Sequence, residues 1–188
     1  MGNHSAKSVH VALLRGVNVG GHRRLPMSAL RALAEDLGWE RVGTYVQSGN
    51  LVFAAGGTCV ALEHALEAAI ERHFEFAVSV AVRTGAQWLT YAAASPYPAA
   101  ESARPTMLQL GLAKHAPKAG AAEQLARYCT LGESVSVRDE VLWIDYAGGV
   151  GRSKLTPAVL ERALGSPVTL RNWKTVQELA ARVRAGGA

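Results

Sequence analysis

The sequence contains only two cysteines, Cys59 and Cys129, among 188 residues. Two thiols cannot form the disulfide framework of a small secreted protein, so we expect small buried thiols in a reducing compartment. No apolar run approaches the roughly 18 residues that cross a membrane. The polar residues 1–8 lack the apolar core of a signal peptide and are expected to form a flexible tail. These absences indicate a cytoplasmic protein with no membrane partner.

Patterns that carry metal or acid–base chemistry are missing too. No two of the six histidines have ligand spacing on one helix face with a partner, so no metal site is predicted. Adjacent acids such as Glu35 and Asp36 point apart, and Glu63 and Glu67, which share a helix face, are expected at the surface. No convincing nucleophile or general base emerges. The sequence therefore indicates no catalytic residue and no particular cofactor.

Charge of one sign is only mildly in excess. Twenty Lys and Arg residues against fifteen Asp and Glu give a net charge of +5, and the isoelectric point is about 9.5. This balance suits a polyanionic partner, but no long basic block accompanies it. Hydrophobic residues at 49% and charged residues at 19% are ordinary for a soluble globular protein.

The residues present divide into two stretches with the same order of elements. In the first, strand-like segments at 9–14, 42–46, 51–54 and 77–82 alternate with helical periods at 27–37, 62–74 and 87–94. Residues 95–105 hold three prolines and are interpreted as a linker. In the second, strands at 106–112, 135–137, 141–146 and 168–170 alternate with helices at 121–131, 160–164 and 176–183. Asn172 is placed to cap the last helix.

Two successive βαββαβ units, each followed by a helix, predict an α+β protein made of two ferredoxin-like subdomains. We expect each to be an antiparallel sheet with its helices on one face, at residues 9–94 and 106–185. We also expect the first and third strands of each sheet to run parallel in its middle. The loops after those strands, 15–26 with 55–58 and 113–120 with 147–155, would then leave at the same end. The segment 171–173 would leave its sheet at the end opposite to the 147–155 loop.

The segment 148–155, Gly-Gly-Val-Gly-Arg-Ser-Lys-Leu, is the first candidate binding loop. It lies between a strand-like run and the helix start at Thr156-Pro157, a layout that points backbone N–H groups at an anion. Gly151, Arg152, Ser153 and Lys154 are its candidate ligand-binding residues. It lacks the order of residues in a P-loop and the third glycine of a dinucleotide fingerprint.

A second candidate loop is Arg15-Gly-Val-Asn-Val-Gly-Gly21. Its glycines permit close approach of backbone to a ligand, and its polar side chains offer directed donors. The alternative is that this loop only makes a tight connection. The candidate residues here and beyond are Arg15, Asn18, Gly20, Gly21, the hairpin residue Asn50 and the helix cap Asn172. The three residues that follow the loop, at 22–24, have two interpretations, a basic patch on its rim or solvated charges, and solvated charges are favoured.

Four ordered stretches resemble the bacterial domain-of-unknown-function 1697 family. They are Leu13–Gly21, Gln47–Asn50, Gly149–Leu155 and Arg171–Trp173. The resemblance runs from about residue 9 to residue 183 and implies the same two α+β halves of ferredoxin-like kind. It implies no activity. Two positions depart from the family pattern, Pro26 before the first helix and Lys174 after Trp173.

The sequence supports three functional hypotheses. In the first, a small phosphate- or carboxylate-bearing ligand binds between the two halves. In the second, which is less favoured, the sheets bind nucleic acid as RNA-recognition domains do, although few aromatic residues fall on the central strands. In the third, the protein has a structural or regulatory role through protein–protein contact. We expect a monomer or a weak homodimer.

Overall fold

The computed structural model describes residues 7–20 and 23–186. Most of the predicted tail, residues 1–8, lies outside this range, but its last two positions do not. Ser8 begins strand β1, and the Nζ atom of Lys7 lies 2.7 Å from Oε1 of Glu40. Any predicted tail therefore ends before residue 7.

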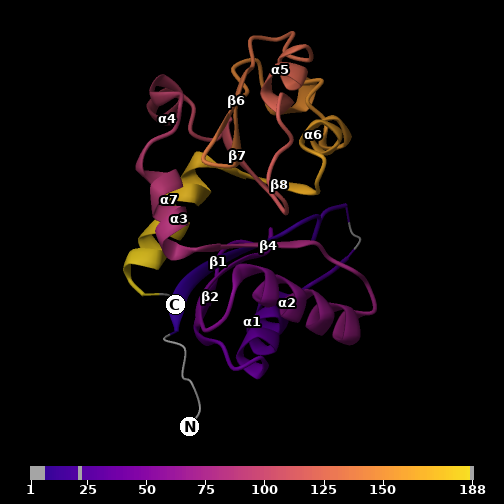
Figure 1. The fold of residues 1–188 in the computed structure, drawn as a ribbon, viewed down its shortest axis with the longest axis vertical. Helices are drawn as coiled ribbons and strands as arrows, with labels where there is room; N and C mark the ends of the chain where they lie inside the picture. Colours follow the sequence, from indigo (N-terminus) through magenta and orange to yellow (C-terminus); the bar gives the residue numbers. More distant parts are fainter. Residues whose placement is uncertain (1–6, 21–22, 187–188) are drawn as a thin grey trace. The chain divides into compact units, whose positions relative to one another are not determined.

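The first half has the predicted order of elements (Figure 1). They are β1 (Ser8–Leu14), α1 (Met27–Asp36), β2 (Glu40–Thr44), β3 (Asn50–Ala55), α2 (Cys59–Phe74), β4 (Val80–Thr84) and α3 (Gly85–Ala93). Helix α2 begins where the hydroxyl of Thr58 accepts a hydrogen bond from the N–H of Ala61.

The second half repeats the order after one additional helix. Its elements are α4 (Pro98–Ala103), β5 (Leu108–Ala113), α5 (Ala121–Ala126), β6 (Ser134–Arg138), β7 (Val141–Asp145), the 3₁₀ turn η1 (Val150–Arg152), α6 (Pro157–Leu164), β8 (Val168–Asn172) and α7 (Trp173–Arg184). Helix α4 lies inside the stretch interpreted as a linker without helix. Pro98 does not prevent this helix, because a proline at the first helical position removes only an N–H that has no helical partner.

Each half is built on a four-stranded antiparallel sheet, in the orders β2-β3-β1-β4 and β6-β7-β5-β8. The protein is thus α+β, with two sheets whose connections are consistent with ferredoxin-like halves. The backbone groups into two compact units. The first runs to Leu89 and also takes the residues from Leu179 onward, and the second is Thr90–Glu178, so both boundaries fall inside helices, α3 and α7.

The prediction that the first and third strands run parallel is wrong. Strand β1 pairs antiparallel with β3 and with β4, and β5 pairs antiparallel with β7 and with β8. A strand–helix–strand crossover reverses direction twice, and the following hairpin reverses it once more, so the third strand opposes the first. The loops after β1 and β3 consequently leave at opposite ends. Strands β7 and β8 run the same way, so the 147–155 loop and Trp173 leave the second sheet at one end.

Helices α1 and α2 cover one face of the first sheet (Figure 1), where Leu14, Phe53 and Val82 are fully buried beneath them. Residues of the opposite face, including Val11, Leu13 and Val52, are fully buried as well. In the second sheet the same holds for Ile144 beneath the helices and for Leu108, Leu110 and Leu112 on the other face. Neither sheet presents a bare central face to solvent.

Glu63 and Glu67 are not the solvated pair that the sequence suggested. Oε1 of Glu63 accepts a hydrogen bond from the N–H of Val82 at 2.8 Å, and Oε1 of Glu67 accepts one from Val80 at 2.8 Å. Glu63 is only 3% exposed. The two carboxylates satisfy backbone donors on β4, the outer strand of its sheet, which would otherwise be open to another strand.

Candidate functional site

The side chain of Asn18 joins the first glycine loop to the β2–β3 hairpin. Its Nδ2 donates to the carbonyl oxygen of Leu25 at 2.9 Å and to that of Gln47 at 2.8 Å. Its Oδ1 accepts the backbone N–H of Leu25 at 2.8 Å. Both amide donors are used within the protein, and the backbone of Asn18 is left-handed, with φ of 57°. Asn18 therefore holds two sequence-distant segments in one place.

The side chain of Asn50 also fixes the β2–β3 hairpin. This side chain is fully buried, and its Nδ2 donates to the carbonyl oxygen of Tyr45 at 2.8 Å and to the hydroxyl of Ser48 at 3.0 Å. The carbonyl oxygen of Gly49 accepts the N–H of Leu14 at 2.8 Å. A side chain at Gly49 would meet Leu14 Cβ at 2.7 Å, so this glycine is required by packing as well as by its φ of +75°. The hairpin and the end of β1 form one rigid corner.

This corner holds a pocket of about 410 Å³, which we call the loop–hairpin pocket. Its lining residues are Asn18, Arg24, Leu25, Pro26 and Gln47. Among the described residues, Arg24 makes no ion pair and is exposed. Leu25 is fully buried, and Pro26 precedes the first residue of α1. The pocket thus combines an apolar wall with one cation.

Of the predicted residues of this loop, only Asn18 lines the pocket. Arg15 is half-buried, and its backbone N–H donates to the carbonyl oxygen of Ser79 at 2.9 Å. Gly20 has a φ of +63° with open space where a side chain would be, and Gly21 lies outside the described residues. The sequence reasoning missed Arg24 and Gln47 as lining residues. Their neighbours Asn18 and Gly49 carried the signal, since each belongs to a motif that positions its surroundings.

The candidate loop at 148–155, which follows β7, uses the Ser153 hydroxyl inside the protein. Ser153 Oγ donates to Oε1 of Glu133 at 2.6 Å and accepts the N–H of Leu155 at 3.2 Å. The hydrogen bond from Ser153 lowers the pKa of the Glu133 carboxyl, which also accepts the N–H of Leu131. A carboxylate therefore already lies where an anion would have to approach Ser153, and it would repel one.

The cations of this loop face solvent. Arg152 and Lys154 are exposed, and Nη2 of Arg152 donates back to the carbonyl oxygen of Gly148 at 3.0 Å. A side chain at Gly148 would lie 2.2 Å from the Leu131 carbonyl oxygen, whereas Gly151 has open space around it. Close packing thus requires Gly148, and nothing in the surroundings of Gly151 requires a glycine.

The third predicted segment, 171–173, ends β8 and begins α7. Oδ1 of Asn172 accepts the N–H of Thr175 at 2.9 Å, which is the predicted helix cap. Trp173 is buried, and its ring centroid lies 5.8 Å from that of Trp143. Arg171 is 8% exposed, and burial lowers its pKa to about 10, which leaves it charged at neutral pH. The roles of this segment seen here are structural.

These motifs match a protein family. Residues 8–143 fit the model of "Protein of unknown function (DUF1697)". The chain belongs to this family. The family match includes the first two motifs, and the motifs at 149–155 and 171–173 lie beyond it. In structure, the chain is similar to the conserved bacterial protein SP0830 from Streptococcus pneumoniae, with a TM-score of 0.73 and 21% identity over 95% of this chain and 99% of that one. The comparison with curated proteins found no match.

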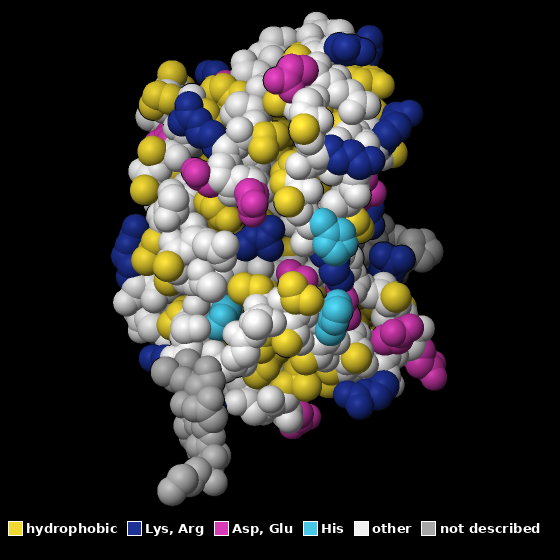
Figure 2. Space-filling view, in the orientation of Figure 1, with side chains coloured by type: hydrophobic (Ala, Val, Ile, Leu, Met, Phe, Trp, Pro, Cys, Tyr) yellow, Lys and Arg dark blue, Asp and Glu magenta, His cyan; other side chains and the backbone are white. Residues whose placement is uncertain are grey.

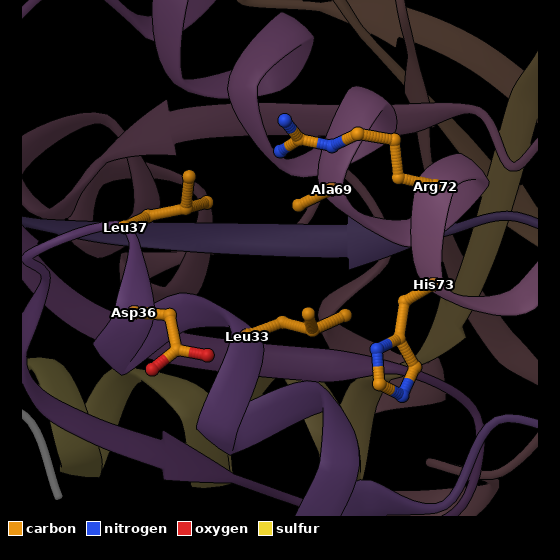
Figure 3. Close-up of a pocket in the computed structure, with 6 residues that line it drawn as sticks. All are labelled: Leu33, Asp36, Leu37, Ala69, Arg72 and His73. Carbon is orange, nitrogen blue, oxygen red and sulfur yellow. The ribbon is translucent and has the colours of Figure 1, made fainter.

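This DUF1697 protein has another shallow pocket, about 240 Å³ in volume, in its first unit. Figure 3 shows Leu33, Asp36 and Leu37 on the α1 side of it, facing Ala69, Arg72 and His73 of α2. An acid stands on one side and two bases on the other, with apolar side chains between them. None of these residues belongs to the motifs that resemble the family.

Other classes of site find no support in the described part of this family member. Across residues 7–20 and 23–186, no helix has the length and apolar character needed to cross a membrane. The same residues contain no cluster of three or more potential metal ligands. On the face drawn in Figure 2, basic and acidic side chains are interspersed and do not form a field of one sign. We therefore take the loop–hairpin pocket as the candidate site, because hydrogen bonds join several of its lining residues.

Proposed function

We propose that this protein binds a small organic anion in the loop–hairpin pocket. The observation that carries the proposal is Arg24, an exposed guanidinium without an ion pair among the described residues, on the wall of a pocket where Asn18 is hydrogen bonded to Leu25 and Gln47. A guanidinium can bind a carboxylate or phosphate with two parallel hydrogen bonds. Because three hydrogen bonds join the Asn18 side chain to Leu25 and Gln47, little ordering of these three residues would be needed on binding.

The N-terminus of helix α1 also favours a negatively charged ligand. Pro26 lines the pocket and stands at the N-cap position, where no side chain accepts a hydrogen bond from the first turn. That turn also contains no acidic residue. The positive end of the helix dipole is therefore not neutralised by its own side chains. It adds to the attraction that Arg24 exerts on an anion.

The glycine loop after β7 supports anion binding less well. Its Arg152 and Lys154 are exposed cations, but Glu133 is hydrogen bonded to the hydroxyl that would complete the site. Nucleic-acid binding through a sheet face is also not favoured. The aromatic residues of the third strands, Phe53 and Trp143, and the neighbouring Tyr146 are at most 2% exposed, so none offers a ring for stacking a base.

The experiment measures binding of small anions by calorimetry and thermal shift, at low and at moderate salt. The panel contains inorganic phosphate, glycerol 3-phosphate, citrate, hexanoate and a single-stranded RNA. We expect at least one small anion to bind, and Arg24→Ala to weaken it by about tenfold or more, because a charge-assisted hydrogen bond contributes roughly 1.5–3 kcal/mol.

The matched control is Arg31→Ala, which removes an exposed arginine from α1 outside the pocket. It should bind as the unaltered protein does. Equal loss in the Arg24 and Arg31 variants would mean that net charge is responsible, and the pocket would be rejected as the site. Binding only to RNA, with a steep salt dependence, would favour the nucleic-acid hypothesis instead.

A further inference from the structure

We infer that the anion bound in the loop–hairpin pocket is a monocarboxylate with a short aliphatic body, an inference that depends on the proposed function. The first argument is the number of donors available. Asn18 lines the pocket, but both of its N–H groups already bond to backbone carbonyl oxygens. The side chains left to bind a ligand are those of Arg24 and Gln47.

One guanidinium matches one carboxylate in charge and in geometry, because two N–H groups meet two oxygens. A phosphate monoester carries nearly two negative charges at neutral pH and has three terminal oxygens to satisfy. A single arginine and one amide would leave part of this negative charge unbalanced and part of the hydrogen-bonding capacity of these oxygens unused. The donor set therefore favours the smaller, singly charged group.

Apolar surface adjoins this cation. Leu25 and Pro26 line the pocket itself. Val19, directly after Asn18, is 68% exposed, and Val46, directly before Gln47, is 49% exposed. Both are large hydrophobic side chains that the fold leaves in water, each next in sequence to a residue that lines the pocket. A ligand with an aliphatic body that extends past Leu25 and Pro26 would have apolar surface to cover, whereas a sugar phosphate would gain nothing from it.

The backbone conformation of Val46 is a separate argument for a binding role of this hairpin. Its φ is 48°, in the left-handed region that β-branched residues avoid. The hairpin holds it there, because the N–H of Tyr45 donates to the Asn50 carbonyl oxygen at 3.1 Å and the Asn50 amide donates back to the Tyr45 carbonyl oxygen. A glycine would fit this turn without strain. An exposed, strained valine next in sequence to a pocket residue fits our inference that the ligand's apolar part reaches it.

The test is a series of acetate, butyrate and hexanoate, with 1-hexanol and glycerol 3-phosphate as comparison ligands, measured by calorimetry and by NMR shift changes. We expect affinity to rise about two- to fourfold per added CH₂ group. 1-Hexanol should bind more weakly than hexanoate because it lacks the charge that pairs with Arg24.

Two variants separate the apolar contact from the ionic one. Val46→Gly should flatten the chain-length series while leaving acetate binding unchanged. Val60→Ala, which alters an exposed valine on α2, should change neither. If glycerol 3-phosphate binds more tightly than hexanoate and this binding requires Arg24, the inference is wrong and the proposed function stands. If no anion requires Arg24, both are wrong.

Discussion

The two halves are alike at one outer strand of each sheet, β4 in the first and β8 in the second. A backbone N–H of that strand donates a hydrogen bond to a glutamate side chain of the preceding helix. Glu67 of α2 accepts the N–H of Val80 at 2.8 Å, and Glu161 of α6 accepts that of Val168 at 3.4 Å. Val80 pairs with the last residue of β1 and Val168 with the last residue of β5, so the two bonds occupy equivalent positions. The repeat predicted from element order thus extends to individual side chains.

The arginines of the outer strands correspond in the same way. Arg83 and Arg171 hold equivalent positions, and Nη1 of each donates to the carbonyl oxygen of the preceding residue at 2.8 Å. The next residue in each half, Thr84 or Asn172, caps the following helix by accepting an N–H three positions on. Edge protection and helix capping are general needs of this topology, which explains why both halves meet them alike.

The halves differ in the loop after the first strand. In the first half, Asn18 fastens this loop to the hairpin and the loop–hairpin pocket results. Both halves tie the residue after the first strand to the residue before the fourth, since the backbone N–H of Arg15 donates to the Ser79 carbonyl oxygen and that of Lys114 to the Pro167 carbonyl oxygen. In the second half, the next residue, His115, also donates its backbone N–H to the Ser166 hydroxyl, which fastens that loop to the α6–β8 connection. The shared devices maintain the fold, and the differing loop marks where one half can acquire a ligand site.

The largest effect that would break this comparison is expected from Gly49→Ala in the first-half hairpin. The new methyl group would lie 2.7 Å from Leu14 Cβ and 2.8 Å from Val17 Cγ2, on a backbone with φ of +75°. We expect a loss of roughly 2–5 kcal/mol in the free energy of unfolding, measured by urea denaturation. Gly20→Ala is the control, because it shares a positive φ but has open space, and it should cost only about 1–2 kcal/mol.

The next effect concerns the carboxylate that only the first half has. Glu63 is four residues before Glu67 and bonds to Val82, whereas the position four residues before Glu161 is Pro157, which begins α6. Glu63→Ala would leave the N–H of Val82 without this acceptor and remove a carboxylate 3.9 Å from Arg83. We expect a loss of roughly 2–4 kcal/mol. Glu161→Ala, which breaks a bond of 3.4 Å, should cost less than about 1 kcal/mol. Equal losses would contradict the difference in geometry.

The sequence predicted the order of elements in both halves, because hydrophobic periodicity and the Asn172 cap are local signals. It did not predict what depends on strand direction and long-range pairing. The antiparallel relation of β1 and β3 was missed, and so was the role of Glu63, which looks like a surface residue until β4 is placed beside α2.

The candidate site was predicted only in part for the same reason. Asn18 and Asn50 were selected as ligand-binding residues, but a polar side chain in a loop looks alike in sequence whether it binds a ligand or the backbone. In the structure both side chains bind the backbone: Asn18 donates to the carbonyl oxygen of Gln47, 29 positions away, and Asn50 to that of Tyr45, 5 positions away. Arg24 was interpreted as a solvated charge because nothing in the adjacent sequence distinguishes it from one.

A smaller effect should appear in the pH dependence of stability. Burial lowers the pKa of His10 on β1 from its ordinary value of 6.5, and its ring stacks on Phe53 at 5.6 Å. The unfolded chain therefore binds a proton more readily, so stability is full above about pH 6.5 and falls as the pH drops through the lowered pKa. The equivalent residue of β5 is Gln109, which does not titrate.

The variant His10→Gln should accordingly lose this dependence, which begins below about pH 6.5, while keeping any slope that carboxylates cause at lower pH. Urea denaturation at a series of pH values measures it. A slope of the same size in the variant and the unaltered protein would show that His10 is not its source.

The smallest effect is expected at the hairpin of the second half. Its turn consists of two acidic residues, Asp139 and Glu140, whereas the hairpin of the first half contains Gly49. Asp139 and Glu140 have φ of 51° and 62°, and both are exposed. Two successive positive φ angles between paired strands define a turn that favours glycine at its second position. Glu140→Gly should therefore stabilise the protein by about 0.5–1 kcal/mol, measured as a rise in the urea midpoint. Destabilisation would mean that the Glu140 side chain has a contact that offsets the strain, and the two hairpins would then differ in more than their turn residues.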